Sequence, residues 1–154
     1  MKQPRLFNEK GQKTRIDNRP AKEEYTGWRD QELSVRHRTI WGYDMPMVDI
    51  DLLVVEYDKR IPIALVEYKW ETRTPRLYGA NYEALRELAD RARIPFFVCG
   101  YKSDFTRWYV HAGNKQSQEL LKTTRQEWAE EEYVTFLYQL KGLTIPENIR
   151  VNLR

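Results

Sequence analysis

Two apolar runs with a polar turn between them dominate the middle of the chain. The first follows Asp51, the second is Ile61–Val66, and the polar segment 57–60 separates them. Runs of this length that are rich in β-branched residues predict the two strands of an antiparallel hairpin. A turn centred on Lys59 places these residues opposite each other: Asp49 and Lys69, Asp51 and Glu67, Leu53 and Leu65, and Val55 and Ile63.

This register gives the hairpin two different surfaces, because side chains alternate between the faces of a strand. One surface is apolar apart from a single hydroxyl, which predicts that it is wholly buried: Ile50, Leu52, Val54, Ala64, Val66 and Tyr68. The other surface is apolar beside the turn and charged at its far end, where Asp51 faces Glu67 and Lys69 follows on the same face. Charge in such a place is costly unless a metal or a substrate uses it.

Helical and extended patterns alternate along the rest of the chain. Apolar residues recur at helical spacing from about 21 to 39 and again over 81–93, where Asn81 is a suitable N-cap and Pro95 ends the helix. Segment 94–101 is almost entirely apolar, which predicts a central strand parallel to a hairpin strand. A further strand is predicted over 106–112, and a long helix over 116–141.

This order of elements predicts one α/β domain, a three-layer sandwich in which helices flank a central mixed sheet. The domain spans residues 21–141 and includes the long C-terminal helix 116–141. A basic N-terminal arm, residues 1–20, precedes it, and a tail, residues 142–154, follows it. A chain of 154 residues is long enough to bury a substantial core.

Composition limits the compartment and the chemistry. A single cysteine excludes a disulfide framework and a thiolate metal cluster, and it fits a reducing cytoplasm. No apolar run reaches transmembrane length and the N-terminus lacks a signal-peptide block, so we expect a cytoplasmic protein with no membrane partner. The sequence has only two histidines, His37 and His111, which with one cysteine are too few for a zinc site. It also lacks the glycine-rich phosphate-binding loop of an NTPase.

Positive charge is concentrated at the start of the chain. Residues 1–22 carry a net charge of +5, and the remainder carries −2. A basic arm suits a polyanion such as nucleic acid, because phosphate contacts by Lys and Arg release counterions; a solvated tail without a partner explains the same charge. Four arginines near the hairpin are candidates for phosphate contacts, with surface solubility as the competing explanation: Arg36, Arg38, Arg73 and Arg76.

The charged end of the hairpin has the residue types of a phosphodiesterase. Opposed carboxylates repel each other and are tolerated where a divalent cation lies between them, and oxygen ligands favour Mg²⁺ or Mn²⁺ over Zn²⁺. Lys69 can orient an attacking water, stabilise negative charge or hold a phosphate. Asp49 is a competing metal ligand. The structural alternative is a surface hairpin in which Lys69 forms ion pairs with Asp49 and Asp51.

The spacing Asp51-x15-Glu67-x-Lys69 resembles the PD-(D/E)xK nuclease superfamily, and within it the archaeal-type Holliday junction resolvases. VDIDLLV and LVEYK resemble two strands of those enzymes, LRELADRARIPFFVCGY followed by RWYVH resembles their next helix and strands, and DQEL resembles the start of their first helix. The resemblance covers about residues 22–112. It implies a restriction-endonuclease-like fold with an αβββαβ core.

The resemblance implies a Mg²⁺-dependent endonuclease, with Mn²⁺ as a substitute, that cuts four-way DNA junctions as a homodimer. Asp51, Glu67 and Lys69 match the catalytic trio, and Asp51, Glu67 and the backbone carbonyl of Tyr68 match the metal ligands. An acid from the first helix matches Asp30, with Glu32 as the alternative. The serine-containing element that precedes the aspartate in the family is replaced here by residues 44–47, so that part of the site need not carry over.

Other functions fit the same residues. Within the superfamily, a restriction or repair nuclease or an exonuclease has the same trio. Outside catalysis, the chain could be a nucleic-acid-binding module whose acids serve the structure, or a protein adaptor that uses its long C-terminal helix. Trp70 and Tyr78 are candidates for stacking on bases, although core packing is the commoner role of tryptophan.

Overall fold

The computed structural model describes residues 48–153. The predicted arm and the predicted first helix lie outside these residues, and so does the segment 44–47. The same holds for four candidate site residues and one histidine, so the expectations about them stay predictions: Asp30, Glu32, Arg36, Arg38 and His37.

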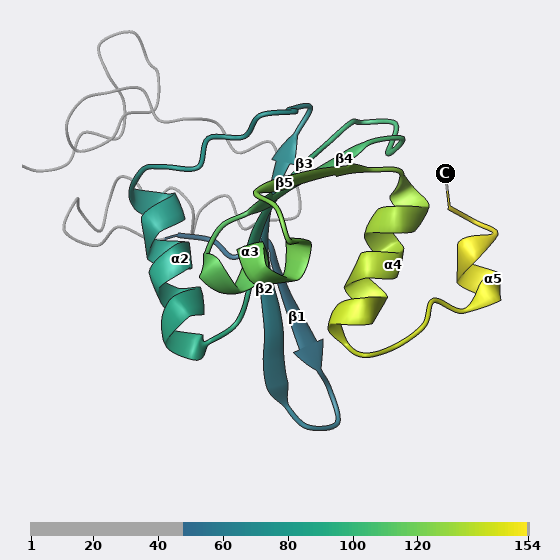
Figure 1. Ribbon diagram of the computed structural model, residues 1–154, viewed down its shortest axis with the longest axis horizontal. Helices are drawn as coiled ribbons and strands as arrows, with labels where there is room; N and C mark the ends of the chain where they lie inside the picture. Colours follow the sequence, from purple (N-terminus) through teal and green to yellow (C-terminus); the bar gives the residue numbers. More distant parts are fainter. Residues whose placement is uncertain (1–47, 154) are drawn as a thin grey trace, which may run out of the picture. The chain divides into compact units, whose positions relative to one another are not determined.

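The described residues alternate between strands and helices (Figure 1), and the bounds of the elements are as follows: β1 (Leu52–Glu56), β2 (Ile61–Trp70), α2 (Ala80–Ala92), β3 (Phe96–Tyr101), β4 (Trp108–Ala112), α3 (Lys115–Leu121), β5 (Arg125–Trp128), α4 (Glu130–Leu140) and α5 (Glu147–Arg150). The last of these lies in the predicted tail. In this part of the chain, none of the helices is long and apolar enough to cross a membrane.

The strands form one mixed sheet with the order β1-β2-β3-β4-β5. β2 and β3 run parallel, because α2 carries the chain back between them, and the other neighbouring pairs are antiparallel. The prediction of an α/β fold with a mixed sheet is confirmed. The apolar strand β3 is central and parallel to a hairpin strand, also as predicted.

The hairpin register is confirmed in its first half and wrong near the turn. Leu53 pairs with Leu65 as predicted, but the register shifts after Val54, so Val55 pairs with Pro62 and not with Ile63. Proline has no N–H to donate to a ladder and is accommodated at edge strands and bulges, which explains why the irregularity lies here.

Helices cover both faces of the sheet. On one face, α2 packs against Leu65, Phe96 and Val98. On the other, Tyr133 of α4 and Leu121 of α3 pack against the even-numbered residues of β2 and the middle of β3 and β4. Figure 1 shows α2 and α4 on opposite sides of the strands. The hairpin surface that was predicted to be wholly buried is buried only in part, because Ile50 precedes the start of β1 and is 46% exposed.

The predicted helix 116–141 is wrong. α3 ends at Leu121, Lys122 adopts a left-handed conformation with φ 56°, and β5 then pairs with β4 before α4 begins. The β-branched Thr123 and Thr124 favour an extended chain here, and pairing with β4 satisfies the backbone of both strands. The ring of Trp128 lies 4.9 Å from that of Phe136, so the strand also buries an aromatic side chain.

α2 begins one residue earlier than its predicted cap. Gly79, with φ 104°, occupies the N-cap position, and Asn81 is already inside the helix. The C-terminal end agrees with the prediction: Arg93 turns into the left-handed conformation and Pro95 lies beyond it.

Candidate active site

β2 places two of the predicted catalytic side chains on the face that α2 covers. Glu67 and Lys69 follow the buried Leu65 at alternate positions, so all three side chains point to that face. Asp51 immediately precedes β1, the neighbour of β2, and its Oδ2 accepts a hydrogen bond from the backbone N–H of Tyr68 at 2.8 Å. The structure therefore brings the three residues of the predicted trio together.

Glu67 is the most unusual group of the trio. Its Oε1 accepts a hydrogen bond from the Lys69 ammonium, whereas its Oε2 is buried and has no hydrogen-bond partner among the described residues. Burial raises the pKa of this carboxyl above its ordinary value; the hydrogen bond from Lys69 acts in the opposite direction, and the negative charge of Asp51 raises the pKa further. Within residues 48–153, one oxygen of this carboxylate therefore has no positively charged partner.

Lys69 lies between the largely buried side chain of Glu67 and solvent. Its side chain is 41% exposed, while that of Glu67 is only 18% exposed, and the two form an ion pair. The ammonium thus stands at the surface with its charge partly neutralised on the buried side. It retains donors that can meet an anionic substrate.

The length difference between the first two strands explains how Asp51 is held. β1 has five residues and β2 has ten, and the pairing between them ends with Leu52 and Val66. The N–H of Tyr68 lies beyond that point, so the side chain of Asp51 takes the place of a strand acceptor. In an extended strand the N–H and C=O of one residue point to the same side, so the carbonyl of Tyr68 also faces this edge.

The side chain of Tyr68 anchors β2 on the opposite face. Its hydroxyl lies 2.8 Å from that of Tyr133, and its ring meets the rings of Tyr101 and Trp108 edge-on. Burial raises the pKa of Tyr68 to about 12, so the phenol stays protonated. The strand that carries the acid and the amine is therefore fixed from behind by an aromatic cluster.

The two aromatic side chains that are candidates for stacking on bases lie on the surface, Trp70 at the end of β2 and Tyr78 in the connection to α2. Trp70 is 68% exposed and Tyr78 is 66% exposed, so neither packs in the core. The guanidinium of Arg76 lies 4.8 Å from the centre of the Tyr78 ring. Arg73, the other predicted phosphate ligand in this connection, donates a hydrogen bond to Glu127 of β5 at 3.3 Å.

The described residues contain no group of three or more His, Cys, Asp and Glu side chains that could hold a metal ion. Asp51 and Glu67 supply two carboxylates, and the acid predicted from the first helix, Asp30 or Glu32, lies outside these residues. The donor chemistry nevertheless fits a hard cation, because the unpartnered Oε2 of Glu67 and the carboxylate of Asp51 are both oxygen ligands.

His111 lies in β4 and contacts the segment that follows β2. It is buried, and its Nε2 lies 3.2 Å from the carbonyl oxygen of Arg73. Burial lowers the pKa of this imidazole, the hydrogen bond to the Arg73 carbonyl opposes the shift, and the positive charge of Arg125 lowers the pKa further. The histidine therefore joins the connection after β2 to the second half of β4.

Three charged residues of the same sheet face were missed from the sequence: Arg107, Arg125 and Glu127. Arg107, Tyr109 and His111 stand at alternate positions in the sequence. This alternation indicates that the side chain of Arg107 lies on the same face of the sheet as the other two. The pattern does not reveal Arg125 and Glu127, because their segment is predicted to be part of a helix.

Comparison with protein-family models, with curated proteins and with solved structures finds no match to this chain.

Proposed function

We propose that this protein is a divalent-metal-dependent DNA endonuclease of the PD-(D/E)xK type. The observation that carries the proposal is the state of Glu67: one oxygen is bound to Lys69, and the other is buried beside Asp51 with no hydrogen-bond partner among residues 48–153. Two acids and an amine on neighbouring strands are suited to phosphodiester hydrolysis, and a cation between the acids would remove the cost of burying their charge.

Each residue then has a separate task. Asp51, Glu67 and the carbonyl of Tyr68 would hold Mg²⁺ or Mn²⁺, with Asp30 or Glu32 as a further ligand. The bound cation would supply Lewis acidity at the phosphate and would lower the pKa of a coordinated water. Lys69, half in solvent and oriented by Glu67, stabilises the negative charge that develops on the phosphate.

The restriction-endonuclease-like arrangement is part of the same proposal. An antiparallel hairpin, then a helix, then a strand parallel to the one that carries Glu67 and Lys69 matches the ββαβ part of the αβββαβ core. The first helix and one further strand of that core are not among the described residues. We further propose a homodimer that acts on four-way DNA junctions, because symmetric nicking of two strands needs two sites.

The test is a cleavage assay on a labelled four-way junction and a linear duplex, each with Mg²⁺ or with EDTA. Wild type should cut in Mg²⁺ only. Asp51→Asn keeps an oxygen that accepts the Tyr68 N–H but loses the charge, and it should cut at least about 100-fold more slowly, the scale of losing a transition-state interaction worth roughly 3 kcal/mol. Asp58→Asn, in the hairpin turn at the other end of β2, is the matched control and should cut like wild type.

The outcomes separate the proposal from its rivals. No cleavage of either DNA by wild type, with DNA binding retained, would leave a non-catalytic nucleic-acid-binding module. Equal cleavage by wild type and Asp51→Asn would move the active site elsewhere. Cleavage of the duplex but not the junction would keep the nuclease and remove the junction-resolving role.

A further inference from the structure

Three arginines surround one glutamate on the sheet face that carries Glu67 and Lys69. Arg73 Nη2 lies 3.3 Å from Oε2 of Glu127, Arg125 Nη2 lies 3.9 Å from the same oxygen, and Arg107 Nε lies 3.8 Å from Oε1. We call Arg73, Arg107 and Arg125 the arginine cluster. They come from the connection after β2, from the residue before β4 and from β5.

The arginine cluster carries more positive charge than its glutamate neutralises. Three guanidiniums face one carboxylate, so the group has a net charge of +2. Only the Arg73 contact is a hydrogen bond to Glu127, and each guanidinium has five N–H donors. The side chains of Arg73, Arg107 and Arg125 are 63%, 51% and 33% exposed, so many of those donors are open to solvent.

The strand register places this cluster in line with the proposed active site. Lys69 pairs with Gly100, Gly100 with Tyr109, and Tyr109 with Glu127, so Lys69 and Glu127 end one row across the sheet. Paired residues point to the same face. Three strand spacings separate the ends of the row, a distance of about 14 Å.

The connection after β2 bridges the two ends of this row. A Cβ on Gly100 would lie 1.9 Å from the carbonyl oxygen of Thr72, so the chain crosses β3 in direct contact with its backbone. The next residue, Arg73, is held through its carbonyl by His111, and its guanidinium lies 5.9 Å from the centre of the Tyr109 ring. The cluster is thus attached to the sheet, and not carried on a free loop.

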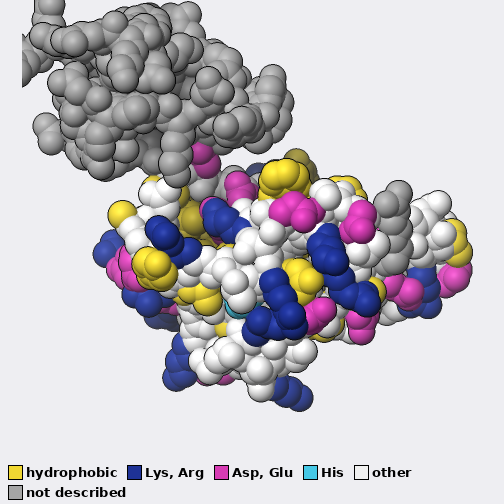
Figure 2. All heavy atoms as spheres, turned by 90° about the horizontal axis from the view of Figure 1, so that it is seen from above, with side chains coloured by type: hydrophobic (Ala, Val, Ile, Leu, Met, Phe, Trp, Pro, Cys, Tyr) yellow, Lys and Arg dark blue, Asp and Glu magenta, His cyan; other side chains and the backbone are white. Residues whose placement is uncertain are grey.

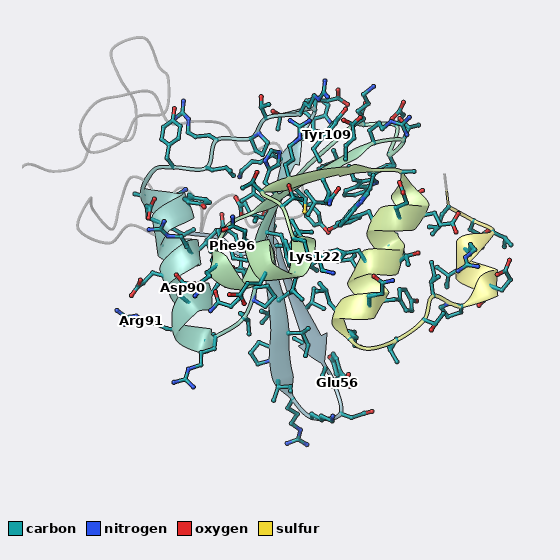
Figure 3. All side chains as sticks on the ribbon, viewed as in Figure 1. Glu56, Asp90, Arg91, Phe96, Tyr109 and Lys122 are labelled. Carbon is teal, nitrogen blue, oxygen red and sulfur yellow. The ribbon has the colours of Figure 1, made fainter. Side chains whose placement is uncertain are left out.

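The views of the molecule agree with this placement. In Figure 3, Tyr109 lies at one end of the sheet and Glu56, beside the hairpin turn, lies at the other. In Figure 2, Lys and Arg side chains gather beside the histidine, with Asp and Glu side chains close to them. Basic and acidic side chains are thus mixed on the face that Figure 2 shows.

We propose that the arginine cluster binds a backbone phosphate of the DNA strand that enters the active site. The inference rests on the proposed function and extends it to a substrate-positioning surface. Planar guanidiniums suit phosphate oxygens, and a phosphate can compete with Glu127 because the carboxylate occupies few of their donors. The bound phosphate would then lie about 14 Å from Lys69, a few nucleotides along the strand from the cleaved bond.

The test measures binding of the full-length protein to a labelled duplex in EDTA, where cleavage does not interfere, over a series of salt concentrations. The slope of log K against log salt is negative, and Arg107→Ala/Arg125→Ala should reduce its magnitude by about 1 to 2. The same variant should bind about 8-fold more weakly per lost contact at 0.1 M salt. Arg107→Lys/Arg125→Lys retains the charge and should keep the wild-type slope. Lys115→Ala/Arg150→Ala removes the same charge from α3 and α5 and is the matched control.

The result that overturns the inference is a wild-type slope and affinity in Arg107→Ala/Arg125→Ala, or an equal loss in the control pair. Retained Mg²⁺-dependent cleavage by wild type in that case would leave the nuclease proposal intact. If the alanine pair melts below wild type, the lysine pair decides: a wild-type slope supports a charge contact, and a slope as low as that of the alanine pair refutes it.

Discussion

Replacing Glu67 by glutamine should stabilise the metal-free protein. In the described part of the chain, one carboxylate oxygen of Glu67 is buried without a hydrogen-bond partner and lies beside the negative charge of Asp51. An unsatisfied buried polar atom costs about 1–3 kcal/mol, and a neutral amide can donate toward Asp51 while its oxygen still accepts from Lys69. Allowing for the lost Glu67–Lys69 ion pair, we expect Glu67→Gln to gain about 1–2 kcal/mol, which is about 2–8 °C in melting temperature for a chain of this size.

The sign with pH follows from the raised pKa of Glu67. Between the ordinary pKa of 4.5 and the higher pKa of the folded state, the carboxyl of Glu67 is deprotonated in the unfolded chain and protonated in the folded protein. Wild-type stability should therefore fall as pH rises from 4.5 through the folded pKa, because the unfolded state binds fewer protons over that interval. Glu67→Gln has no proton to lose at this position, so its advantage over wild type should be largest at neutral pH.

Adding Mg²⁺ should reverse the order of the two proteins. A ligand that binds only the folded state stabilises it by RT ln(1 + [L]/Kd), and Glu67 is one of the two described carboxylates that would hold the cation. Thermal melting in EDTA and in millimolar Mg²⁺ should show a large rise for wild type and little for Glu67→Gln. The matched control is Glu87→Gln, which also removes an ion-paired glutamate, the partner of Arg91 on α2. A variant that melts below wild type in EDTA at neutral pH, and rises equally in Mg²⁺, would refute the reasoning.

Three further predictions concern the surrounding structure. Gly100→Ala should destabilise the protein by about 3 kcal/mol in urea unfolding, because its Cβ would meet the Thr72 carbonyl at 1.9 Å; an unchanged midpoint would contradict the close crossing. Cys99 is fully buried and its pKa is raised to about 12 by burial, so an aromatic disulfide reagent should label it only at the rate of unfolding, and rapid labelling would show that the core is open. Burial lowers the pKa of His111, so as pH falls below about 6.5 the unfolded chain gains this proton first and stability should drop until the folded pKa is reached; His111→Gln should lack this drop between pH 7 and 5 when the two proteins are compared in urea.

The candidate site could be predicted from the sequence as far as local pattern determines it. Alternation along one hairpin was enough to place Glu67 and Lys69 on one face and Asp51 beside them, since strand periodicity and a short turn fix the register. The shift after Val54 was not visible, because it depends on how Pro62 is accommodated in the ladder. That error lies near the turn and does not reach the charged end.

The arginine cluster could not be predicted, because it depends on contacts between distant segments. Arg125 and Glu127 lie in a segment with apolar residues at helical spacing on both sides, and only the free edge of β4 makes it a strand. Arg73 reaches Glu127 because Gly100 lets the connection cross β3. Thr123 and Thr124 favour an extended chain locally, but the pairing of β5 with β4 is a contact between distant segments that the helical spacing on both sides conceals.

The unequal lengths of β1 and β2 give the candidate site its form. β1 pairs with β2 only as far as Val66, so the last residues of β2 present backbone groups at an edge within the described sheet. Asp51 satisfies one of these groups, the N–H of Tyr68, and the same carboxylate faces Glu67. An acid that is required by the strand backbone is held in position before any cation binds, which reduces the reorganisation needed at the site. Asp51→Ala should therefore lose stability as well as activity, whereas Asp51→Asn, which preserves the acceptor, should lose activity alone; equal stability of the two variants would show that the hydrogen bond to Tyr68 does not position the acid.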